Sequence, residues 1–375
     1  MKKILEKYIL RFQAILFLVL FAVLLIPNVR VSAAETKTVE LVAVGDDLIH
    51  TSVYRACKTR KGYNFDPLFK HIKKDIRAAD ISVINQETIL VDKNYSGYPS
   101  FGSPKAVADA VAKAGFNVVT HATNHTLDKG TGAITGTLKY WNRKYPNIKV
   151  LGIHKSKSAA DKVTVIQKNG IKIAMLNYTY GLNGRRLPAG KSYMIDLLTP
   201  QNRNKIKKDI KEAKKKSDFV IVFAHWGTEY RYAPDVSQKN WTNFFLNNGV
   251  DLLIGTHPHV LEPYKMLKGN NGKKMLVYYS LGNFVSAQNR VPRLLGGMAK
   301  VTIVKDGKNT YIKKYTMEPL VTHISRYYKS FTVYKLKDYT NALAKANNIR
   351  RISPREAFSV TSLINLYKKI TGRKA

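Results

Sequence analysis

Five short segments of this chain concentrate side chains that bind metal ions, and four of them directly follow an apolar run. Each offers carboxylate, amide or imidazole groups where a strand is expected to end. Imidazole combined with carboxylate and amide oxygen suits zinc, manganese or iron rather than calcium. Two such ions ~3.5–4 Å apart would activate water and stabilise a displaced oxyanion. The segments are Gly45-Asp46-Asp47, Asn85-Gln86-Glu87, Thr123-Asn124-His125, His225-Trp226-Gly227-Thr228-Glu229 and Gly255-Thr256-His257-Pro258-His259.

The recurrence of these segments, rather than any one of them, indicates a metal site. A lone aspartate at a strand end usually caps a helix or forms a turn. His257 and His259 are separated by one residue, and Pro258 stiffens the backbone between them. Asp46 and Glu87 supply carboxylates, one of which could bridge two ions. The pattern therefore predicts divalent metal ions, up to two, of manganese, zinc or iron.

Alternating apolar runs and helical patterns, from Thr38 onwards, have to position these segments. Helices between strands predict strands buried by helices, and hairpins add antiparallel pairs, so we expect an α/β sandwich with mixed sheets. Ligands of α/β proteins gather at the carboxyl ends of strands, where the five segments lie. Strands are expected at residues 39–45, 80–85, 116–120, 149–153, 163–167, 171–178, 219–224, 250–254, 274–280, 298–305 and 310–317, and helices at 69–79, 104–114, 130–144, 200–216, 237–247 and 354–370.

Two local signals set element boundaries. Lys168-Asn169-Gly170 lies between two apolar runs and predicts a hairpin with a type I′-like turn. Ser103 before Pro104 predicts the cap and first position of a helix, and Gly115 predicts its end.

Residues 1–34 have the pattern of an export signal or a membrane anchor. Four basic residues precede or flank the apolar run 14–26, and small residues follow up to Ser32-x-Ala34. The run is shorter than the ~20 residues of a typical spanning helix, although neighbouring apolar residues could extend it past Arg11. A cleaved signal peptide and a retained anchor both stay open. In either case we expect the rest of the chain to be extracytoplasmic, secreted or membrane-anchored.

The chain carries 63 Lys and Arg against 25 Asp and Glu, a formal net charge of +38. Residues 1–34 hold five Lys or Arg and one Glu, so nearly all of this excess belongs to the rest of the chain. Outside a cell, anionic lipid, teichoic acid or an acidic capsule polymer is the expected partner, and nucleic acid is not. A lysine-rich surface without such a partner is the alternative. Cys57 is the only cysteine, which excludes an internal disulfide.

The segments, together with Thr126-Leu127-Asp128 and Tyr279–Phe284, resemble in order the motifs of the CapA/PgsA family. These are poly-γ-glutamate capsule biosynthesis proteins with a calcineurin-like metallophosphatase fold, and the resemblance covers residues 38–320. It implies that His125 polarises or protonates a leaving group, with Asp128 as a carboxylate that supports its protonated form. The metal-binding positions that it implies are Asp46, Glu87, Asn124, His225, His257 and His259.

The sequence departs from the metallophosphatase pattern in two of its motifs. Metallophosphatases usually carry Asp-x-His in the first motif, whereas Asp47-Leu48 follows Asp46 here, and His50 is the candidate substitute. Glu87 stands where the second motif usually ends in aspartate. Glu229 is expected to be a partner of an imidazole rather than a metal ligand.

The resemblance implies an extracytoplasmic protein of poly-γ-glutamate synthesis or export, acting with membrane-bound capsule synthesis subunits at the cytoplasmic membrane. The alternative is an active metal-dependent hydrolase of a phosphoester or an amide at the cell surface. A plain adhesin is disfavoured because it would not need clustered imidazoles and carboxylates. The predicted organisation is a signal or anchor at 1–34, a metallophosphatase-like domain at 38–320, and a C-terminal extension of unknown role at 321–375.

Overall fold

The structure, a computed structural model, describes residues 1–24, 36–270 and 272–375. The chain divides into two compact units, Met1–Thr36 and Lys37–Ala375. In the first unit, helix α1 spans Lys2–Leu24. Among the described residues, no helix combines the length and the apolar character needed to cross a membrane. The predicted cleavage segment with Ser32-x-Ala34 lies outside the described residues.

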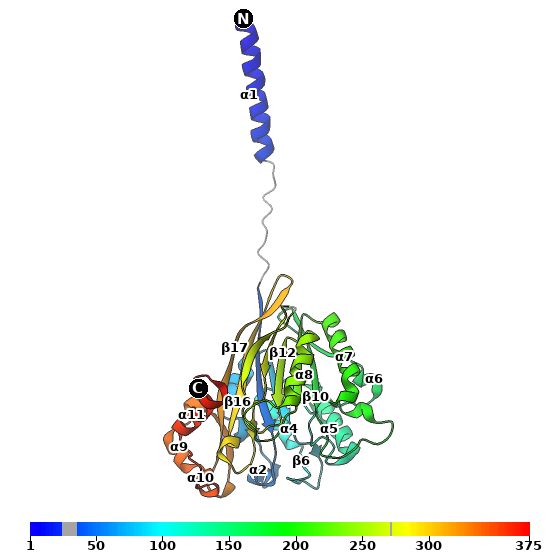
Figure 1. Cartoon of the computed structure of the whole chain (residues 1–375), viewed down its shortest axis with the longest axis vertical. Coiled ribbons are helices and arrows are strands. Elements are labelled where there is room, and N and C mark those ends of the chain that lie inside the picture. Colours follow the sequence, from blue (N-terminus) through cyan, green and yellow to red (C-terminus); the bar gives the residue numbers. More distant parts are fainter. Residues whose placement is uncertain (25–35, 271) are drawn as a thin grey trace. The chain divides into compact units, whose positions relative to one another are not determined.

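Two mixed β-sheets form the second unit (Figure 1). In the first sheet, β1, β4, β7 and β8 are parallel, while β16, β17 and β18 extend it with antiparallel strands. Its order is β18 (Phe331–Lys335), β17 (Asn309–Ile324), β16 (Leu295–Asp306), β1 (Lys37–Asp47), β4 (Ile81–Gln86), β7 (Val118–Thr120) and β8 (Lys149–Leu151), with β15 (Asn283–Val285) paired to β1. The second sheet has the order β13 (Tyr264–Lys268), β14 (Lys274–Tyr278), β12 (Leu252–Thr256), β11 (Phe219–His225), β10 (Ile171–Thr179) and β9 (Thr164–Lys168), of which β14, β12, β11 and β10 are parallel.

The main core fills the space between the two sheets and continues onto the outer side of the first sheet. Leu41 and Ala43 of β1 belong to the same buried cluster as Ile173 of β10 and Ile221 of β11. Side chains alternate across a strand, so neighbouring residues such as Val222 face the other side of the second sheet. There they pack with the buried faces of helices α7 (Arg203–Lys216) and α8 (Val236–Asn247). The observed layers confirm the predicted mixed α/β sandwich.

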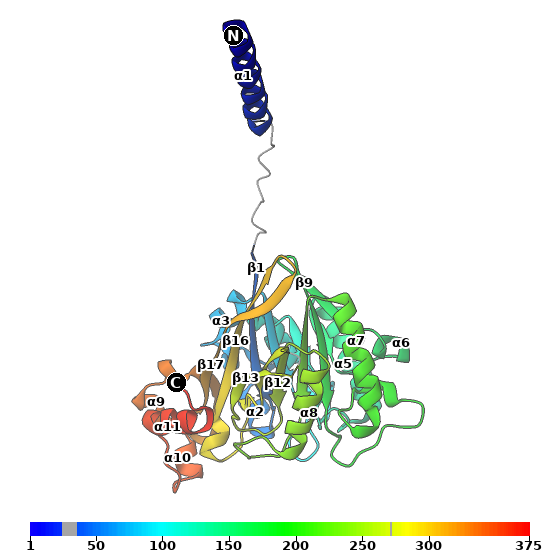
Figure 2. The ribbon, with the colours of Figure 1, turned by 45° about the horizontal axis from the view of Figure 1, so that its top comes forward.

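Helices also cover the outer side of the first sheet. Ser82 of β4 donates through Oγ to the Ile76 carbonyl of α3 (Lys73–Ala78). Val107 and Val111 of α4 (Ala106–Ala114) belong to the same buried cluster as Ile84, which faces the same side of β4 as Ser82. Helices α5 (Gly130–Lys144), α6 (Lys157–Ala160) and α7 lie on one flank of the unit, and α9 (Asn341–Ala346), α10 (Ile349–Ile352) and α11 (Val360–Thr371) lie on the opposite flank (Figures 1 and 2). The remaining short elements are α2 (Thr51–Ala56), α3 (Lys73–Ala78), β2 (Lys58–Thr59), β3 (Gly62–Tyr63), β5 (Leu90–Val91), β6 (Ser103–Pro104), and 3-10 turns at Asp66–Phe69, Ser192–Met194, Pro200–Asn202, Val291–Leu294, Arg326–Tyr328 and Leu336–Asp338.

The hairpin prediction is confirmed and the helix-start prediction is wrong. Asn169 and Gly170 have φ of 47° and 74° between the antiparallel strands β9 and β10, as a type I′ turn requires. Ser103 does not cap a helix, because its backbone pairs with β5 and its hydroxyl lies 2.7 Å from Thr88 Oγ1. Helix α4 begins instead at Ala106. The helix expected at 69–79 is confined to α3.

Residues 321–375 continue the second unit without a break at the predicted boundary. Strand β17 runs through it to Ile324. Helix α11 places Leu363, Tyr367 and Ile370 in the main core, and the Tyr367 hydroxyl donates to the Met317 carbonyl at 2.6 Å.

Candidate metal centre

The candidate ligands come from the carboxyl ends of strands in both sheets, at the edge where α2 follows β1 (Figure 1). In the first sheet, Asp46 pairs with Asn85, which lies two residues before Glu87 in the same motif. The His257 backbone N–H, which follows β12 of the second sheet, donates to Asp46 at 3.2 Å (Oδ2) and 3.3 Å (Oδ1). In chain order the ligands are Asp46 in β1, Glu87 after β4, Asn124 after β7, His225 ending β11, and His257 and His259 after β12.

Five of these side chains meet in a buried cluster. His259 Nδ1 lies 3.1 Å from Asp46 Oδ2, and its Nε2 lies 3.7 Å from Glu87 Oε1. His225 Nε2 lies 3.7 Å from the same Glu87 oxygen and 2.8 Å from Asn124 Oδ1. All five residues are buried. The structure thus brings together ligands that are up to 213 positions apart in the sequence, from Asp46 to His259.

Several polar atoms of this cluster have no hydrogen-bond partner. They are both carboxylate oxygens of Glu87 and Nδ1 of His257. An unpaired buried polar group destabilises a fold by about 1–3 kcal/mol, so such atoms are rare unless they have a function. Three overlapping groups of described residues have ligand atoms within 4.8 Å of one another. The groups are Glu87–His225–His257, Asp46–Glu87–His259 and Glu229–His257–His259.

This donor set fits divalent metal ions. Imidazole nitrogens and carboxylate oxygens lie close enough to share an ion after small adjustments, because metal–ligand distances are ~2.0–2.2 Å. A bound cation would also satisfy the unpaired atoms of Glu87 and His257. Which of the six implied residues hold an ion, and which metal it is, stays a prediction.

Burial sets the protonation of the cluster. It raises the pKa of Glu87 well above its usual range, and the nearby Asp46 carboxylate raises it further. Burial lowers the pKa of His225 and His257 well below the usual range, and neighbouring imidazoles add to this effect. These two rings are therefore neutral near pH 7 and offer lone pairs. Burial lowers the pKa of His259 as well, but the Glu87 and Asp46 carboxylates outweigh it and raise that pKa to about 9. A bound cation would oppose the raised pKa values of Glu87 and His259.

The residues that orient the ligands were not singled out by the sequence argument. Asn85 donates to Asp46 Oδ1 at 2.8 Å and accepts from Thr120 at 2.7 Å. Asn283 Oδ1 lies 2.9 Å from His259 Nδ1, and Thr256 Oγ1 lies 3.0 Å from His225 Nδ1. Their position at strand ends beside the ligands is the signal that could have identified them.

His125 and Asp128 form the expected pair beside the cluster. His125 Nδ1 lies 2.7 Å from Asp128 Oδ2, and because a carboxylate only accepts, the Nδ1–H donates. Asp128 is held in place by the Phe101 backbone N–H at 2.7 Å and by Arg185 Nε at 3.6 Å. Both members of the pair are buried.

A cavity of about 560 Å³ adjoins this pair. The candidate ligand Asn124 lines this cavity, so the cavity reaches the cluster of candidate metal ligands. Arg185 is held there by a type I′ turn over Leu182–Arg185, in which Asn183 and Gly184 have φ of 52° and 75°. The Arg185 N–H donates to the Leu182 carbonyl at 2.9 Å.

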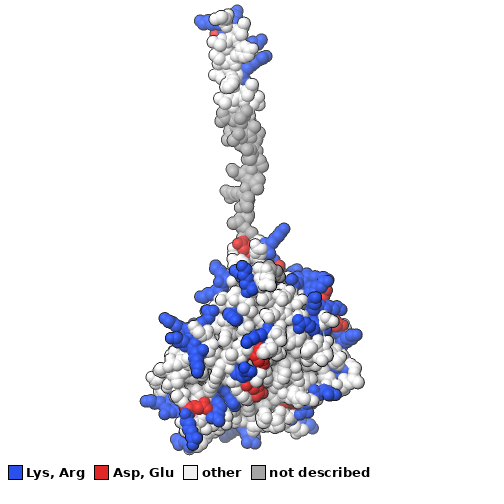
Figure 3. Space-filling model, in the orientation of Figure 1, with Lys and Arg blue, Asp and Glu red and all other residues white. Residues whose placement is uncertain are grey.

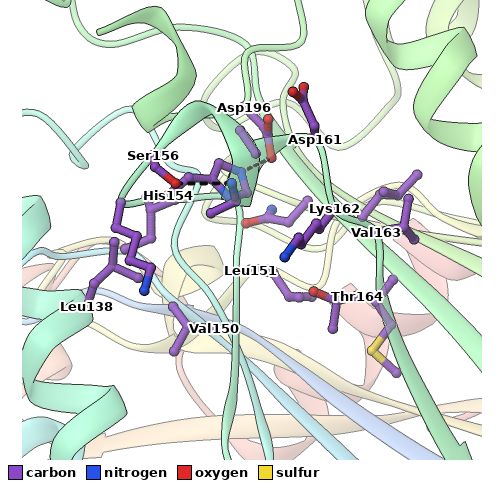
Figure 4. A pocket seen from close by; sticks show the side chains of 18 of the residues that line it. Leu138, Val150, Leu151, His154, Ser156, Asp161, Lys162, Val163, Thr164 and Asp196 are labelled. Carbon is purple, nitrogen blue, oxygen red and sulfur yellow. Dashed lines mark hydrogen bonds and ion pairs between the residues drawn. The ribbon is translucent and has the colours of Figure 1, made fainter.

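A second cavity, of about 420 Å³, is lined by none of the candidate metal ligands (Figure 4). His154 Nε2 lies 2.6 Å from Asp196 Oδ2 there, and Lys205 lies 3.3 Å from the other Asp196 oxygen. These contacts occupy the polar groups of Asp196 and give His154 a structural partner. The cavity next to His125 is therefore the better candidate for a substrate.

His50, the sequence candidate for a substitute ligand, belongs to none of the three donor groups among the described residues. Its Nδ1 lies 3.1 Å from the Leu48 carbonyl and accepts from the Ala287 N–H at 3.3 Å. Glu229, expected only to support an imidazole, belongs to one of those groups.

Comparisons with known proteins agree on one family. The sequence model described as "Bacterial capsule synthesis protein PGA_cap" matches residues 40–288, which include every candidate ligand. The PGA biosynthesis protein CapA of Bacillus subtilis (strain 168) is 28% identical over 318 residues, which cover 83% of this chain and 80% of that protein. The capsule biosynthesis protein CapA of Bacillus anthracis is 27% identical over 265 residues, covering 68% of this chain and 61%, less than two thirds, of that protein.

Solved structures that can be superposed on this chain have low sequence identity to it. The calcineurin-like phosphoesterase YfkN from Bacillus subtilis is 13% identical with a TM-score of 0.44, covering 89% of this chain and 98% of that one. A phosphatase from Mycoplasma pneumoniae is 14% identical with a TM-score of 0.44, covering 76% of this chain and 95% of that one. These similarities are too low to assign an activity.

Proposed function

The chain belongs to the bacterial capsule synthesis protein family, and we propose that it acts in the synthesis or export of an anionic capsule polymer of the poly-γ-glutamate type. The family membership carries this proposal, because the relatives that the chain resembles over most of its length are named for PGA or capsule biosynthesis. Capsule synthesis subunits in the membrane are the protein partners that the proposal implies.

The surface charge supports a polyanionic ligand. Lys and Arg are scattered over the second unit in the view of Figure 3, and Asp and Glu are seen there less often. Poly-γ-glutamate carries one carboxylate on every residue, so any stretch of the polymer can be attracted to this basic surface. Arg185 places one cation at the cavity that reaches the metal cluster.

The metal centre is the second part of the proposal. Asp46, Glu87, Asn124, His225, His257 and His259 would hold one or two divalent ions of manganese, zinc or iron in a fold of the calcineurin-like metallophosphatase kind. Bound ions would polarise an ester or amide oxygen and lower the pKa of a water molecule. The protein's own contribution is a buried, pre-arranged donor set, supported by Asn85, Thr256 and Asn283.

Binding of the polymer tests the first part of the proposal. Purified full-length protein should bind poly-γ-glutamate, and the affinity should fall as salt rises, because mobile ions screen charges over ~10 Å at 0.1 M. A neutral polymer of similar length serves as the control. Absent binding, or binding that salt does not change, would contradict a polyanion partner.

A metal-dependent hydrolase remains the second candidate, favoured by the His125–Asp128 pair. His125 lines the cavity that reaches the metal cluster, while Asp128 fixes its ring through Nδ1. In a hydrolase, Nε2 of the protonated ring would give a proton to the leaving group. A scaffold that only holds polymer would not need this arrangement.

Replacing the pair separates the two candidates. In a hydrolase, His125→Ala should lower turnover of a phosphoester or γ-glutamyl amide by about 100-fold or more while polymer binding stays unchanged. His71→Ala is a control, since His71 stacks on Tyr334 away from the cluster. Wild-type protein without turnover on either substrate class would leave polymer handling as the function.

A further inference from the structure

We infer that Glu229 is a metal ligand of this centre and completes the donor set on its solvent side. This inference rests on the metal centre proposed above. Glu229 is the one exposed member of the three donor groups, whereas the other members are buried. Its carboxylate oxygen lies within 4.8 Å of ring nitrogens of both His257 and His259. Each of these histidines also belongs to one of the other two groups, so Glu229 reaches both ends of the buried cluster.

The backbone around Glu229 is fixed against the histidine loop. The N–H of the next residue, Tyr230, donates to the Pro258 carbonyl at 2.8 Å, between the two histidines. On the other side, Trp226 is buried and donates through Nε1 to the Tyr279 carbonyl at 2.9 Å. Gly227 turns the chain between them with φ of 88°. The backbone that carries Glu229 is therefore held beside the two histidines.

The distances favour metal ligation over direct pairing with an imidazole. No ion pair joins Glu229 to His257 or His259 in the described structure, although their ligand atoms lie within 4.8 Å. Two atoms that each bind one ion at ~2.0–2.2 Å can lie as far apart as ~4.4 Å. A small rotation of an exposed side chain closes this difference. The unpartnered Nδ1 of the buried His257 is a second, independent sign that a ligand is missing at this place.

Glu229 also changes which metal the centre should prefer. With Asp46 and Glu87 it makes three carboxylates, which equal in number the imidazoles of His225, His257 and His259. Oxygen-rich sites favour manganese or iron(II) relative to zinc, more than sites dominated by imidazole do. We therefore expect Glu229 to contribute to manganese binding in particular.

Manganese binding to full-length protein tests the inference without any activity assay. The number of ions bound after equilibrium dialysis, and the affinity read from the EPR signal of free Mn²⁺, would be compared for wild type, Glu229→Gln and His50→Ala. Glu229→Gln keeps the size of the side chain and removes its charge. The affinity of at least one ion should fall about tenfold or more in Glu229→Gln and stay at the wild-type value in His50→Ala.

The outcomes separate the inference from the proposal beneath it. Wild-type affinity and stoichiometry in Glu229→Gln would overturn the role of Glu229 and leave the metal centre intact. A loss in His50→Ala but not in Glu229→Gln would also overturn it, in favour of His50. Wild-type protein that binds no manganese, zinc or iron would overturn the metal centre and the role of Glu229 together.

Discussion

Buried atoms without partners are the feature of single residues that most clearly marks this site. A carboxylate that gives up water without gaining a hydrogen bond destabilises the fold, and Glu87 does so with both oxygens. Unlike Glu87, Asp46 accepts from Asn85 and from the His257 backbone. The contrast indicates that Glu87 is the carboxylate best placed to be shared between ions.

Glu262 provides a pH-dependent test of burial near the site. Burial raises its pKa to about 8, and its side chain accepts a hydrogen bond from Gln238 Nε2 at 2.6 Å. Between pH 4.5 and pH 8 the unfolded chain releases this proton while the folded protein keeps it. The wild-type free energy of unfolding should therefore fall with rising pH, by at most about 1.4 kcal/mol per pH unit from this group.

The variant Glu262→Gln cannot titrate, so it isolates this effect. The difference in Tm, variant minus wild type, should become more positive from pH 5 to pH 8, because only wild type loses stability through this group. Other groups titrate equally in both proteins and cancel. A Tm difference that is the same at both pH values would show that Glu262 keeps an ordinary pKa.

At the scale of elements, the close approach of β1 and the segment before β15 depends on a glycine. A Cβ on Gly45 would lie 1.8 Å from the Gly282 carbonyl oxygen, a backbone atom that cannot move alone. That carbonyl accepts the Asp46 N–H at 3.0 Å, so the close approach also positions a ligand. Glycine at the end of β1 is therefore required by the contact with the segment before β15.

We expect Gly45→Ala to lower the free energy of unfolding by about 1–3 kcal/mol and to weaken metal binding. Gly136→Ala is the matched control, because its Cβ would meet nothing within 4 Å in the middle of α5. The control should stabilise the protein by about 0.5–1 kcal/mol, since alanine favours a helix over glycine. Thermal unfolding followed by circular dichroism measures both, and equal effects of the two substitutions would contradict the close-contact argument.

For the whole molecule, the open question is on which side of the membrane the second unit works. Residues 1–34 have the pattern of an export signal or anchor, and the unit that follows holds nearly all of the positive charge. We predict that protease added to intact cells degrades the second unit, because export would place it outside the cytoplasmic membrane. A cytosolic protein in the same cells should stay intact.

The N-terminal residue of the protein isolated from cells then distinguishes a cleaved signal peptide from a retained anchor at residues 1–34. A chain that starts near residue 35 would indicate a cleaved signal peptide, and one that starts at Met1 would indicate a retained anchor. Protection of the second unit until the cells are lysed would contradict an extracytoplasmic location in either form.

Strand and helix periodicity, turn residues and the recurrence of polar groups after apolar runs are local properties, so the sequence predicted them. The mixed sandwich, the β9–β10 hairpin and helix α5 are cases in which local preference and packing agree. The expected cap at Ser103 failed because pairing of its backbone with β5, a contact across the fold, outweighed the local capping preference.

In the candidate site, too, some features are local and can be predicted from sequence, while others depend on contacts across the fold. The ligand types could be read from five strand ends, because carboxylates and imidazoles after buried strands are visible in the sequence. The choice between His50 and Glu229 could not be read there, because it depends on which loop lies against His257 and His259. That proximity is set by the pairing of β11 with β12 and by the Tyr230–Pro258 hydrogen bond, both of which join residues distant in sequence.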